Sequence, residues 1–250
     1  MSDNNQYDHC YEKEKPLCFA TEKNMIGIYD YTVILTYMSL LSAVSGVALT
    51  MNGHPIIATL CLLFCGFCDM FDGKVARTKK NRTDEEKSYG IQIDSLSDIV
   101  AFGVLPAAIS ISLCRARWYV IVFAAFFVLA GLIRLAYFNV TEEQRQQETD
   151  ECRKSYTGLP ITASALIFPL FFCIISGVCL YFGDITRFSP LFDRWGFQAA
   201  LCGLLGVTGL LYILPFRLRK PQSREMWLML GVGVLIALFL LAVLLRKALA

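Results

Sequence analysis

Residues 68–100 read CDMFDGKVARTKKNRTDEEKSYGIQIDSLSDIV, and this stretch decides how the chain is interpreted. It places four aspartates within segments that are otherwise apolar enough to cross a membrane: Asp69, Asp72, Asp94 and Asp98. An ionised aspartate at the centre of a bilayer costs roughly 2.5–3.5 kcal/mol on insertion scales. Four such residues are therefore unexpected unless they serve a function, and their spacing indicates which function.

Composition places the chain in the membrane class. Of its 250 residues, 56% are hydrophobic and only 18% are charged, and the mean hydropathy is +0.51. A formal net charge of +2 is too small to favour nucleic acid as a partner. The polar first thirty residues have neither a cationic start nor an apolar core, so we expect no cleaved signal peptide. We predict an integral, multi-pass membrane protein with a cytosolic N-terminus.

Apolar runs separated by turn residues predict an all-α fold, a polytopic membrane helix bundle. The expected spans are about 32–51, 56–77, 90–113, 118–139, 158–182, 196–216 and 226–245. A polar loop is expected before the third span, up to Tyr89, and Pro106 is expected to kink that span. The expected organisation is an N-terminal tail with an interfacial segment over 1–30, a six-helix core over 31–216 and at least one extra span over 217–250.

Basic residues in the short connections predict the orientation. The connections after the second, fourth and sixth spans carry eleven Lys or Arg residues, against six at the opposite ends. The positive-inside rule therefore places the first group in the cytosol, with the four aspartates near that side. With seven spans, the C-terminus would lie outside.

Ten cysteines do not imply disulfides in this chain. Most lie in apolar runs, where Cys behaves as a small buried hydrophobe, and thiols of a cytosolic tail stay reduced. Cys61, Cys65 and Cys68 form C-x3-C-x2-C, a spacing known from radical-type iron–sulfur enzymes. Because all three share one face of a predicted span, we interpret them as small residues that let helices approach closely, with the cluster as the alternative.

Helical periodicity brings the four aspartates onto two stripes. At about 100° per residue, one stripe lies on the second span and the other on the third: Asp69, Asp72, Gly73 and Ala76, then Gly90, Asp94 and Asp98. If the stripes face each other, the carboxylates need divalent cations to neutralise them. Neither stripe carries His or Cys, so the oxygen donors favour Mg²⁺ or Mn²⁺ over zinc. Two such ions, held by all four aspartates, suit phosphoryl transfer.

The neighbouring residues fit the same chemistry. Gly73 and Ala76 leave room for a nucleotide, Arg77 offers a bidentate fork to phosphate, and Gly90 opens the third helix. Asp98 is the deepest aspartate from the cytosolic end, and we predict that it both contacts metal and acts as the general base toward an incoming hydroxyl. The alternative is that the aspartates only form structural ion pairs with nearby basic residues.

The pattern Asp69-x-x-Asp72-Gly73-x-x-Ala76-Arg77, followed by Gly90-x-x-x-Asp94-x-x-x-Asp98, resembles the signature of the CDP-alcohol phosphatidyltransferases in all eight positions. The resemblance implies a membrane enzyme that moves a phosphatidyl or related group from a CDP-linked donor to an alcohol and releases CMP. It also implies a homodimer. Twelve residues separate Arg77 from Gly90, which is more than is usual in the family, so the intervening loop is expected to be longer.

A second resemblance concerns the acceptor. RLAYFN (134–139) closes the fourth span and YTGLP (156–160) opens the fifth, a pairing similar to that of membrane-embedded phosphatidylserine synthases of bacteria and archaea. This implies CDP-diacylglycerol and L-serine as substrates. An intramembrane arginine suits the serine carboxylate. The predicted serine site consists of Arg134, Asn139, Lys154 and Tyr156.

Several alternatives stay open at this point. Arg134 would have no acceptor role if it only reaches toward the interface or pairs with an acid, and Gly158 and Pro160 fit a plain helix start. The acceptor could instead be glycerol 3-phosphate or an inositol compound. A cation-coupled transporter is the alternative from another class. For the enzyme we expect a single displacement without a covalent intermediate, since no nucleophile is evident beside the carboxylates.

Overall fold

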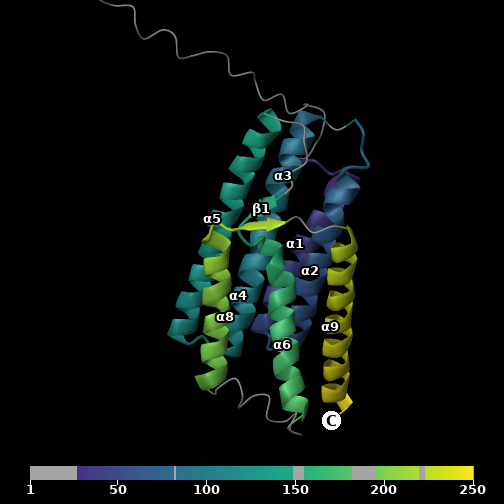
Figure 1. Ribbon diagram of the computed structural model, residues 1–250. Coiled ribbons are helices and arrows are strands. Elements are labelled where there is room, and N and C mark those ends of the chain that lie inside the picture. Colours follow the sequence, from purple (N-terminus) through teal and green to yellow (C-terminus); the bar gives the residue numbers. More distant parts are fainter. Residues whose placement is uncertain (1–26, 82, 149–154, 182–194, 220–222, 250) are drawn as a thin grey trace, which may run out of the picture.

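The computed structural model describes residues 27–81, 83–148, 155–181, 195–219 and 223–249, which form an up-and-down bundle of long helices (Figure 1). Six helices in this part of the chain are long and apolar enough to cross a membrane: Tyr31–Met51, Pro55–Ala76, Glu85–Leu113, Trp118–Glu142, Trp195–Ile213 and Arg224–Arg246. A shorter apolar helix, Ile161–Gly177, lies among them. The prediction of a polytopic membrane helix bundle is confirmed.

The first two helices form an antiparallel pair. A 3-10 turn, η1 (Tyr31–Val33), leads into α1 (Ile34–Met51). The Asp30 carboxylate caps the start of η1 by accepting from the Tyr31 N–H at 2.7 Å. α2 (Pro55–Ala76) begins with a proline in its first turn, where the missing N–H removes no helical hydrogen bond. α1 packs against α2 more extensively than any other pair of elements in the described chain.

The third span differs from its prediction at its start. α3 (Asp84–Asp98) already begins at Asp84, so the expected polar loop up to Tyr89 is wrong. A capping box causes the earlier start, because the Thr83 hydroxyl accepts from the Glu86 N–H at 3.2 Å and the Glu86 carboxylate accepts from the Thr83 N–H at 3.3 Å. The helix therefore extends one and a half turns beyond the apolar run.

A widened turn follows Asp98 within the same span. The π-helical segment η2 (Ile99–Val104) joins α3 to α4 (Leu105–Leu113), and the Leu105 N–H donates to the Val100 carbonyl, five residues earlier. Pro106 has no N–H to offer to the Phe102 carbonyl, one helical turn earlier. The Ser164 hydroxyl of α6 donates to that carbonyl instead, at 2.9 Å. Next to Pro106, where a kink was predicted, the span thus contains a wide turn that a neighbouring helix contacts.

The second half of the bundle contains the remaining elements: α5 (Trp118–Glu148), β1 (Ser155–Thr157), η3 (Ile161–Ala163), α6 (Ser164–Tyr181), α8 (Trp195–Ile213), β2 (Arg217–Arg219) and α9 (Ser223–Leu249). α5 continues past its predicted end at Asn139. The two short strands pair antiparallel, with Tyr156 opposite Leu218. This pairing places the α5–α6 and α8–α9 connections at the same end of the bundle (Figure 1).

Aromatic and small residues make the contacts between helices. Phe127 of α5 lies with its ring centroid 5.3 Å from that of Phe168 of α6 and 5.5 Å from that of Tyr212 of α8. Gly66 of α2 lies so close to Ala165 of α6 that an added Cβ would stand 2.7 Å from the Ala165 Cβ. Without a strong hydrophobic force between helices in lipid, such close approach holds the bundle together. α9 packs on the outside, against α2 and α6.

The cysteines of the C-x3-C-x2-C stripe lie in the contact between α1 and α2. Cys65 is buried, and its thiol donates to the Ser39 carbonyl at 3.3 Å. The Ser42 hydroxyl donates to the Cys61 carbonyl at 3.3 Å. All three cysteines are free thiols, and the candidate metal group among the described residues includes none of them. The burial of Cys65 and these two hydrogen bonds support the packing interpretation.

Candidate active site

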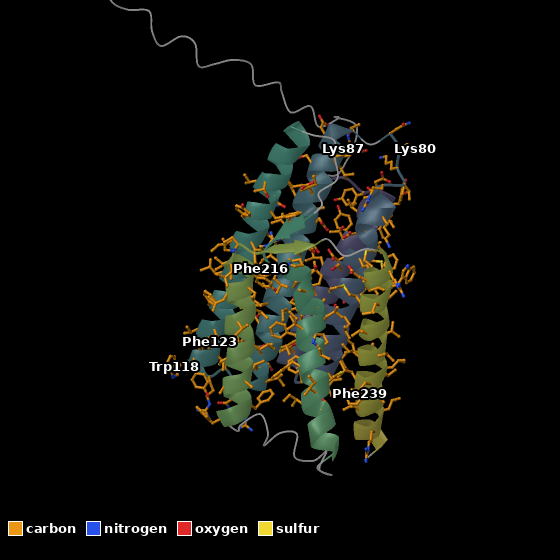
Figure 2. All side chains as sticks on the ribbon, in the orientation of Figure 1. Lys80, Lys87, Trp118, Phe123, Phe216 and Phe239 are labelled. Carbon is orange, nitrogen blue, oxygen red and sulfur yellow. The ribbon has the colours of Figure 1, made fainter. Side chains whose placement is uncertain are left out.

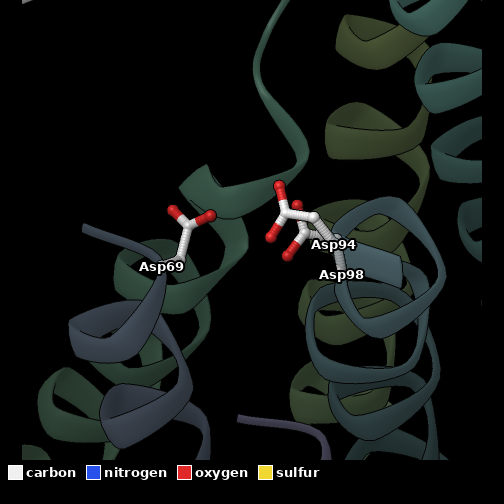
Figure 3. A group of neighbouring side chains, drawn as sticks. All are labelled: Asp69, Asp94 and Asp98. Carbon is white, nitrogen blue, oxygen red and sulfur yellow. The ribbon is translucent and has the colours of Figure 1, made fainter. Parts of the chain in front are cut away.

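Three aspartates from two helices point toward one shared space (Figure 3). Asp69 comes from α2, and Asp94 and Asp98 come from successive turns of α3. One carboxylate oxygen of each lies within 4.8 Å of the others. Oxygens that share one Mg²⁺ at about 2.1 Å lie up to about 4.2 Å apart, so a small inward movement would bring all three onto one ion. The all-oxygen donor set therefore fits a hard divalent cation.

A pocket of about 250 Å³ adjoins this cluster between the start of α1, the end of α2 and α3. Six of the eight signature residues line it: Asp72, Gly73, Ala76, Arg77, Gly90 and Asp94. Asp94 belongs to both the pocket and the carboxylate cluster, so the two are continuous. The fourth aspartate, Asp72, thus lies on the pocket side of the cluster. Together the cluster and the pocket account for every signature position.

The end of α2 shapes the wall of this pocket. The Gly73 N–H donates to the Asp72 carboxylate, and the Arg77 Nε donates to the Gly73 carbonyl at 2.9 Å. The Arg77 side chain is exposed and lies over Gly73, where an added Cβ would stand 3.8 Å from its Nη2. Arg77 is thereby held at the rim of the pocket, where a phosphate group could meet its guanidinium.

Arg134, predicted to bind the acceptor, is buried and fastens the turn before α6. Its Nε donates to the Leu159 carbonyl at 3.2 Å, and its guanidinium carbon lies 5.5 Å from the centroid of the Phe138 ring. The turn requires glycine, because Gly158 has φ +76° and an added Cβ would stand 3.2 Å from two backbone carbonyl oxygens near the end of α8. The Gly158 N–H donates to the Phe216 carbonyl at 2.7 Å.

Asn139, the second predicted acceptor residue, lies beside the aspartate helix. Its amide nitrogen donates to the Ser95 hydroxyl at 2.8 Å, and Ser95 directly follows Asp94. The backbone of Tyr156 lies in β1, but its side chain and the whole of Lys154 lie outside the described residues. The serine site therefore stays a prediction, with Asn139 placed next to the carboxylates through Ser95.

Reasoning from the sequence missed the contribution of the first span. Thr32 and Val33 of η1 and Thr36 of α1 line the pocket opposite α2 and α3. Thr32 and Thr36 are buried. In the sequence they are two threonines in an apolar run, and nothing local signals that this run packs beside α3. The Asp30 cap signals where the helix begins but not what it faces.

Comparison with known proteins relates this geometry to a family. The profile described as CDP-alcohol phosphatidyltransferase matches residues 31–188, more than half of the chain. The chain belongs to the CDP-alcohol phosphatidyltransferase family. Within the family match lie the carboxylate cluster, the pocket and Arg134, whereas α8 and α9 follow it.

Three relatives illustrate the similarity. The CDP-diacylglycerol–serine O-phosphatidyltransferase of Saccharomyces cerevisiae is 36% identical over 166 residues, which cover 64% of this chain and 58% of the yeast protein. The archaetidylserine synthase of Methanothermobacter thermautotrophicus is 33% identical, over 58% of this chain and 60% of that protein. The CDP-diacylglycerol–serine O-phosphatidyltransferase of Methanocaldococcus jannaschii is 31% identical, over 75% of this chain and 77% of that protein. The match thus spans about three fifths of the first two relatives.

Proposed function

We propose that this protein transfers the phosphatidyl group of CDP-diacylglycerol to the hydroxyl of L-serine, which yields phosphatidylserine and CMP. The observation that carries the proposal is the convergence of all eight signature residues on one carboxylate cluster and one adjoining pocket. The names of the yeast and Methanocaldococcus relatives, both serine O-phosphatidyltransferases, support serine as the acceptor. CDP-diacylglycerol and serine are therefore the first substrates to test.

The two halves of the donor have separate places beside the cluster. The cytidine nucleotide fits the pocket, with Arg77 at its rim for a phosphate. An apolar groove of about 260 Å³ lies between α2, α6 and α9, and its lining includes Phe67, Met70 and Gly233. Met70 directly follows Asp69 along α2, so this groove reaches the level of the carboxylates. An apolar groove at this position supports a lipid-borne donor, because acyl chains leave water for apolar surfaces.

The reaction needs a base for one proton. In the proposed step the serine hydroxyl oxygen forms a bond to the phosphatidyl phosphorus, the phosphoanhydride P–O bond breaks, and CMP leaves with the bonding electrons. Asp98, which the cluster places beside Asp69 and Asp94, takes the hydroxyl proton. Two divalent cations, Mg²⁺ or Mn²⁺, held by these residues and Asp72 would neutralise the pyrophosphate charge and stabilise the leaving group.

Acceptor binding is assigned to residues at the end of α5 and in the α5–α6 connection. Arg134 is proposed to meet the serine carboxylate, with Asn139, Lys154 and Tyr156 completing the site. The Asn139–Ser95 contact supports this assignment, because it brings an amide next to the helix turn that carries Asp94. A hydroxyl activated by Asp98, one turn further along α3, would then be within reach of the donor.

The active site is proposed to open toward the cytosol. Figure 2 shows Lys80 and Lys87 at the end of the bundle that carries the α2–α3 connection, and Trp118 near the opposite end. The β1–β2 pairing brings residues 155–157 and 217–219, which belong to the other two basic connections, side by side. An excess of Lys and Arg on one side supports a cytosolic location for that side.

The decisive experiment measures release of CMP from CDP-diacylglycerol by the purified protein in mixed micelles. We expect release to require both L-serine and Mg²⁺ or Mn²⁺, and to stop when EDTA is added. Release with glycerol 3-phosphate or inositol but not with serine would contradict the acceptor, while the carboxylate site would stand. No CMP release with any acceptor would refute the enzyme and favour a cation-coupled transporter.

A second measurement tests the single displacement. Incubation with CDP-diacylglycerol that carries radiolabel in its phosphatidyl group should leave no label on the protein after denaturation. A labelled protein, or exchange of labelled CMP into CDP-diacylglycerol in the absence of serine, would contradict the proposed step.

A further inference from the structure

Lys79 forms ion pairs with Asp30 and Glu86, next to the segments that line the proposed nucleotide pocket. The Lys79 ammonium lies 2.6 Å from Oδ2 of Asp30 and 2.9 Å from each carboxylate oxygen of Glu86. All three side chains are about one quarter exposed. The hydrogen bond that the Lys79 ammonium donates to Asp30, followed by those it donates to Glu86, favours the charged form and raises the pKa of Lys79.

Each member of this network belongs to a different wall of the pocket. Asp30 precedes the pocket residue Thr32 by two positions, and Lys79 follows the pocket residue Arg77 by two. Glu86 lies four residues before Gly90, which is one turn earlier on the same face of α3. The Lys79 ammonium is thus the point at which the three walls are tied together.

Both carboxylates are fixed by a second contact of their own. The other oxygen of Asp30 caps η1 through the Tyr31 N–H, at 2.7 Å, and Glu86 completes the capping box with Thr83. A carboxylate that also caps a helix has little freedom to follow a moving lysine. A displacement of Lys79 would therefore displace the starts of η1 and α3 as well.

Hydroxyl groups make further contacts between the same three segments, near the ion pairs of Lys79. The Thr78 and Tyr31 hydroxyl oxygens lie 3.4 Å apart, and the Tyr37 hydroxyl donates to the Ile28 carbonyl at 3.0 Å. The Tyr37 and Tyr89 hydroxyls lie 3.2 Å apart, which joins α1 to α3. These neutral contacts are weaker than the charged ones, so Lys79 is the residue on which the joining of the three segments depends.

We propose that Lys79 is a positioning residue for the donor: its ion pairs with Asp30 and Glu86 hold the three walls of the pocket at the spacing that the cytidine nucleotide requires. This role rests on the proposed function. Exposed ion pairs add little to folding stability, so the effect belongs in nucleotide affinity rather than in the melting temperature. Lys79 need not touch the substrate, because the walls it joins carry Thr32, Arg77 and Gly90.

The test compares Lys79→Met with Lys80→Met. Lys80 is the next residue, is exposed, and carries the same charge at the same end of the bundle, so its variant controls for loss of surface charge (Figure 2). For Lys79→Met we expect the KM for CDP-diacylglycerol and the Kd for CDP in the presence of Mg²⁺ to rise about 3- to 10-fold, with kcat within about twofold. Lys80→Met should match the wild type in all three.

Asp30→Asn separates positioning from direct contact with phosphate. It removes the partner charge without removing side-chain volume, so we expect it to raise the same KM and Kd, and to add little when combined with Lys79→Met. Lys79→Arg should restore most of the affinity. If Lys79 instead bound the donor phosphate directly, Asp30→Asn would leave the KM unchanged or lower it, which would overturn the proposal.

Two further outcomes would also decide against this role. An equal rise of KM in Lys79→Met and Lys80→Met would assign the effect to general surface charge. An unchanged KM and Kd in an active Lys79→Met protein would overturn the positioning role alone, whereas a wild-type protein that releases no CMP would overturn the proposed function with it. Should Lys79→Met fail to fold, Asp30→Asn and Glu86→Gln supply the same comparison.

Discussion

Substituting Gly66 by alanine tests the contact that holds α2, the helix that carries Asp69, in place. The new Cβ would lie 2.7 Å from the Ala165 Cβ, whereas carbon atoms prefer a separation of about 3.5–4.0 Å. Both atoms are fixed to helix backbones, so no side chain can rotate away, and α2 and α6 must move apart by roughly 1 Å. Overpacking of this kind costs about 1–3 kcal/mol, or a fall of about 2–12 °C in the melting temperature.

The same displacement should appear in the metal dependence. Asp69 follows Gly66 by three residues on α2, so moving this helix away from α6 changes the spacing between Asp69 and the two aspartates of α3. We expect Gly66→Ala to need several-fold more Mg²⁺ for half-maximal CMP release and to turn over more slowly at saturating Mg²⁺.

The assay pairs thermal unfolding in detergent with Mg²⁺ titration of CMP release. Gly203→Ala is the matched control, because Gly203 lies in the apolar helix α8 and an added Cβ there would meet nothing within 4 Å. A Gly66→Ala protein with the melting temperature and Mg²⁺ dependence of the Gly203→Ala control would refute the close α2–α6 contact and its link to Asp69.

Three further substitutions test other parts of the site. Asp98→Asn should lower turnover at least about 100-fold, as loss of a general base does, with a near-wild-type melting temperature; near-wild-type turnover would exclude Asp98 as the base. Gly158→Ala forces a non-glycine residue to φ +76° and should destabilise the protein by at least about 1–2 kcal/mol in thermal or denaturant unfolding. Gly233→Phe, but not the exposed control Gly231→Phe, should raise the KM for long-chain CDP-diacylglycerol while sparing a short-chain donor.

Local periodicity explains why the carboxylate cluster could be predicted from the sequence. Asp94 and Asp98 lie one turn apart, and helix geometry alone puts them on one face. The start of α3 could also have been read locally, since Thr83-x-x-Glu86 is a capping-box pattern, but the polar residues after it favoured a loop.

Other features depend on contacts between segments that are distant in the sequence. Arg134 reaches the Leu159 carbonyl and Asn139 reaches Ser95, and neither partner follows from residue type or spacing. Within the π-helical turn η2, the Phe102 carbonyl likewise finds its partner in Ser164, which comes from another helix. The contribution of Thr32 to the pocket follows only once α1 is seen beside α3. Tertiary packing, rather than local propensity, decides these features.

The pairing of β1 with β2 determines where the chain can be shortened. Arg217 lies opposite Thr157, and the Phe216 carbonyl receives the Gly158 N–H. A stop codon after the last turn of α8 would remove both contacts from the turn that Arg134 fastens. A stop codon after Arg219 would keep the whole strand but remove α9, which forms one wall of the apolar groove, so such a protein should keep the turn at Gly158 and lose affinity for a long-chain donor.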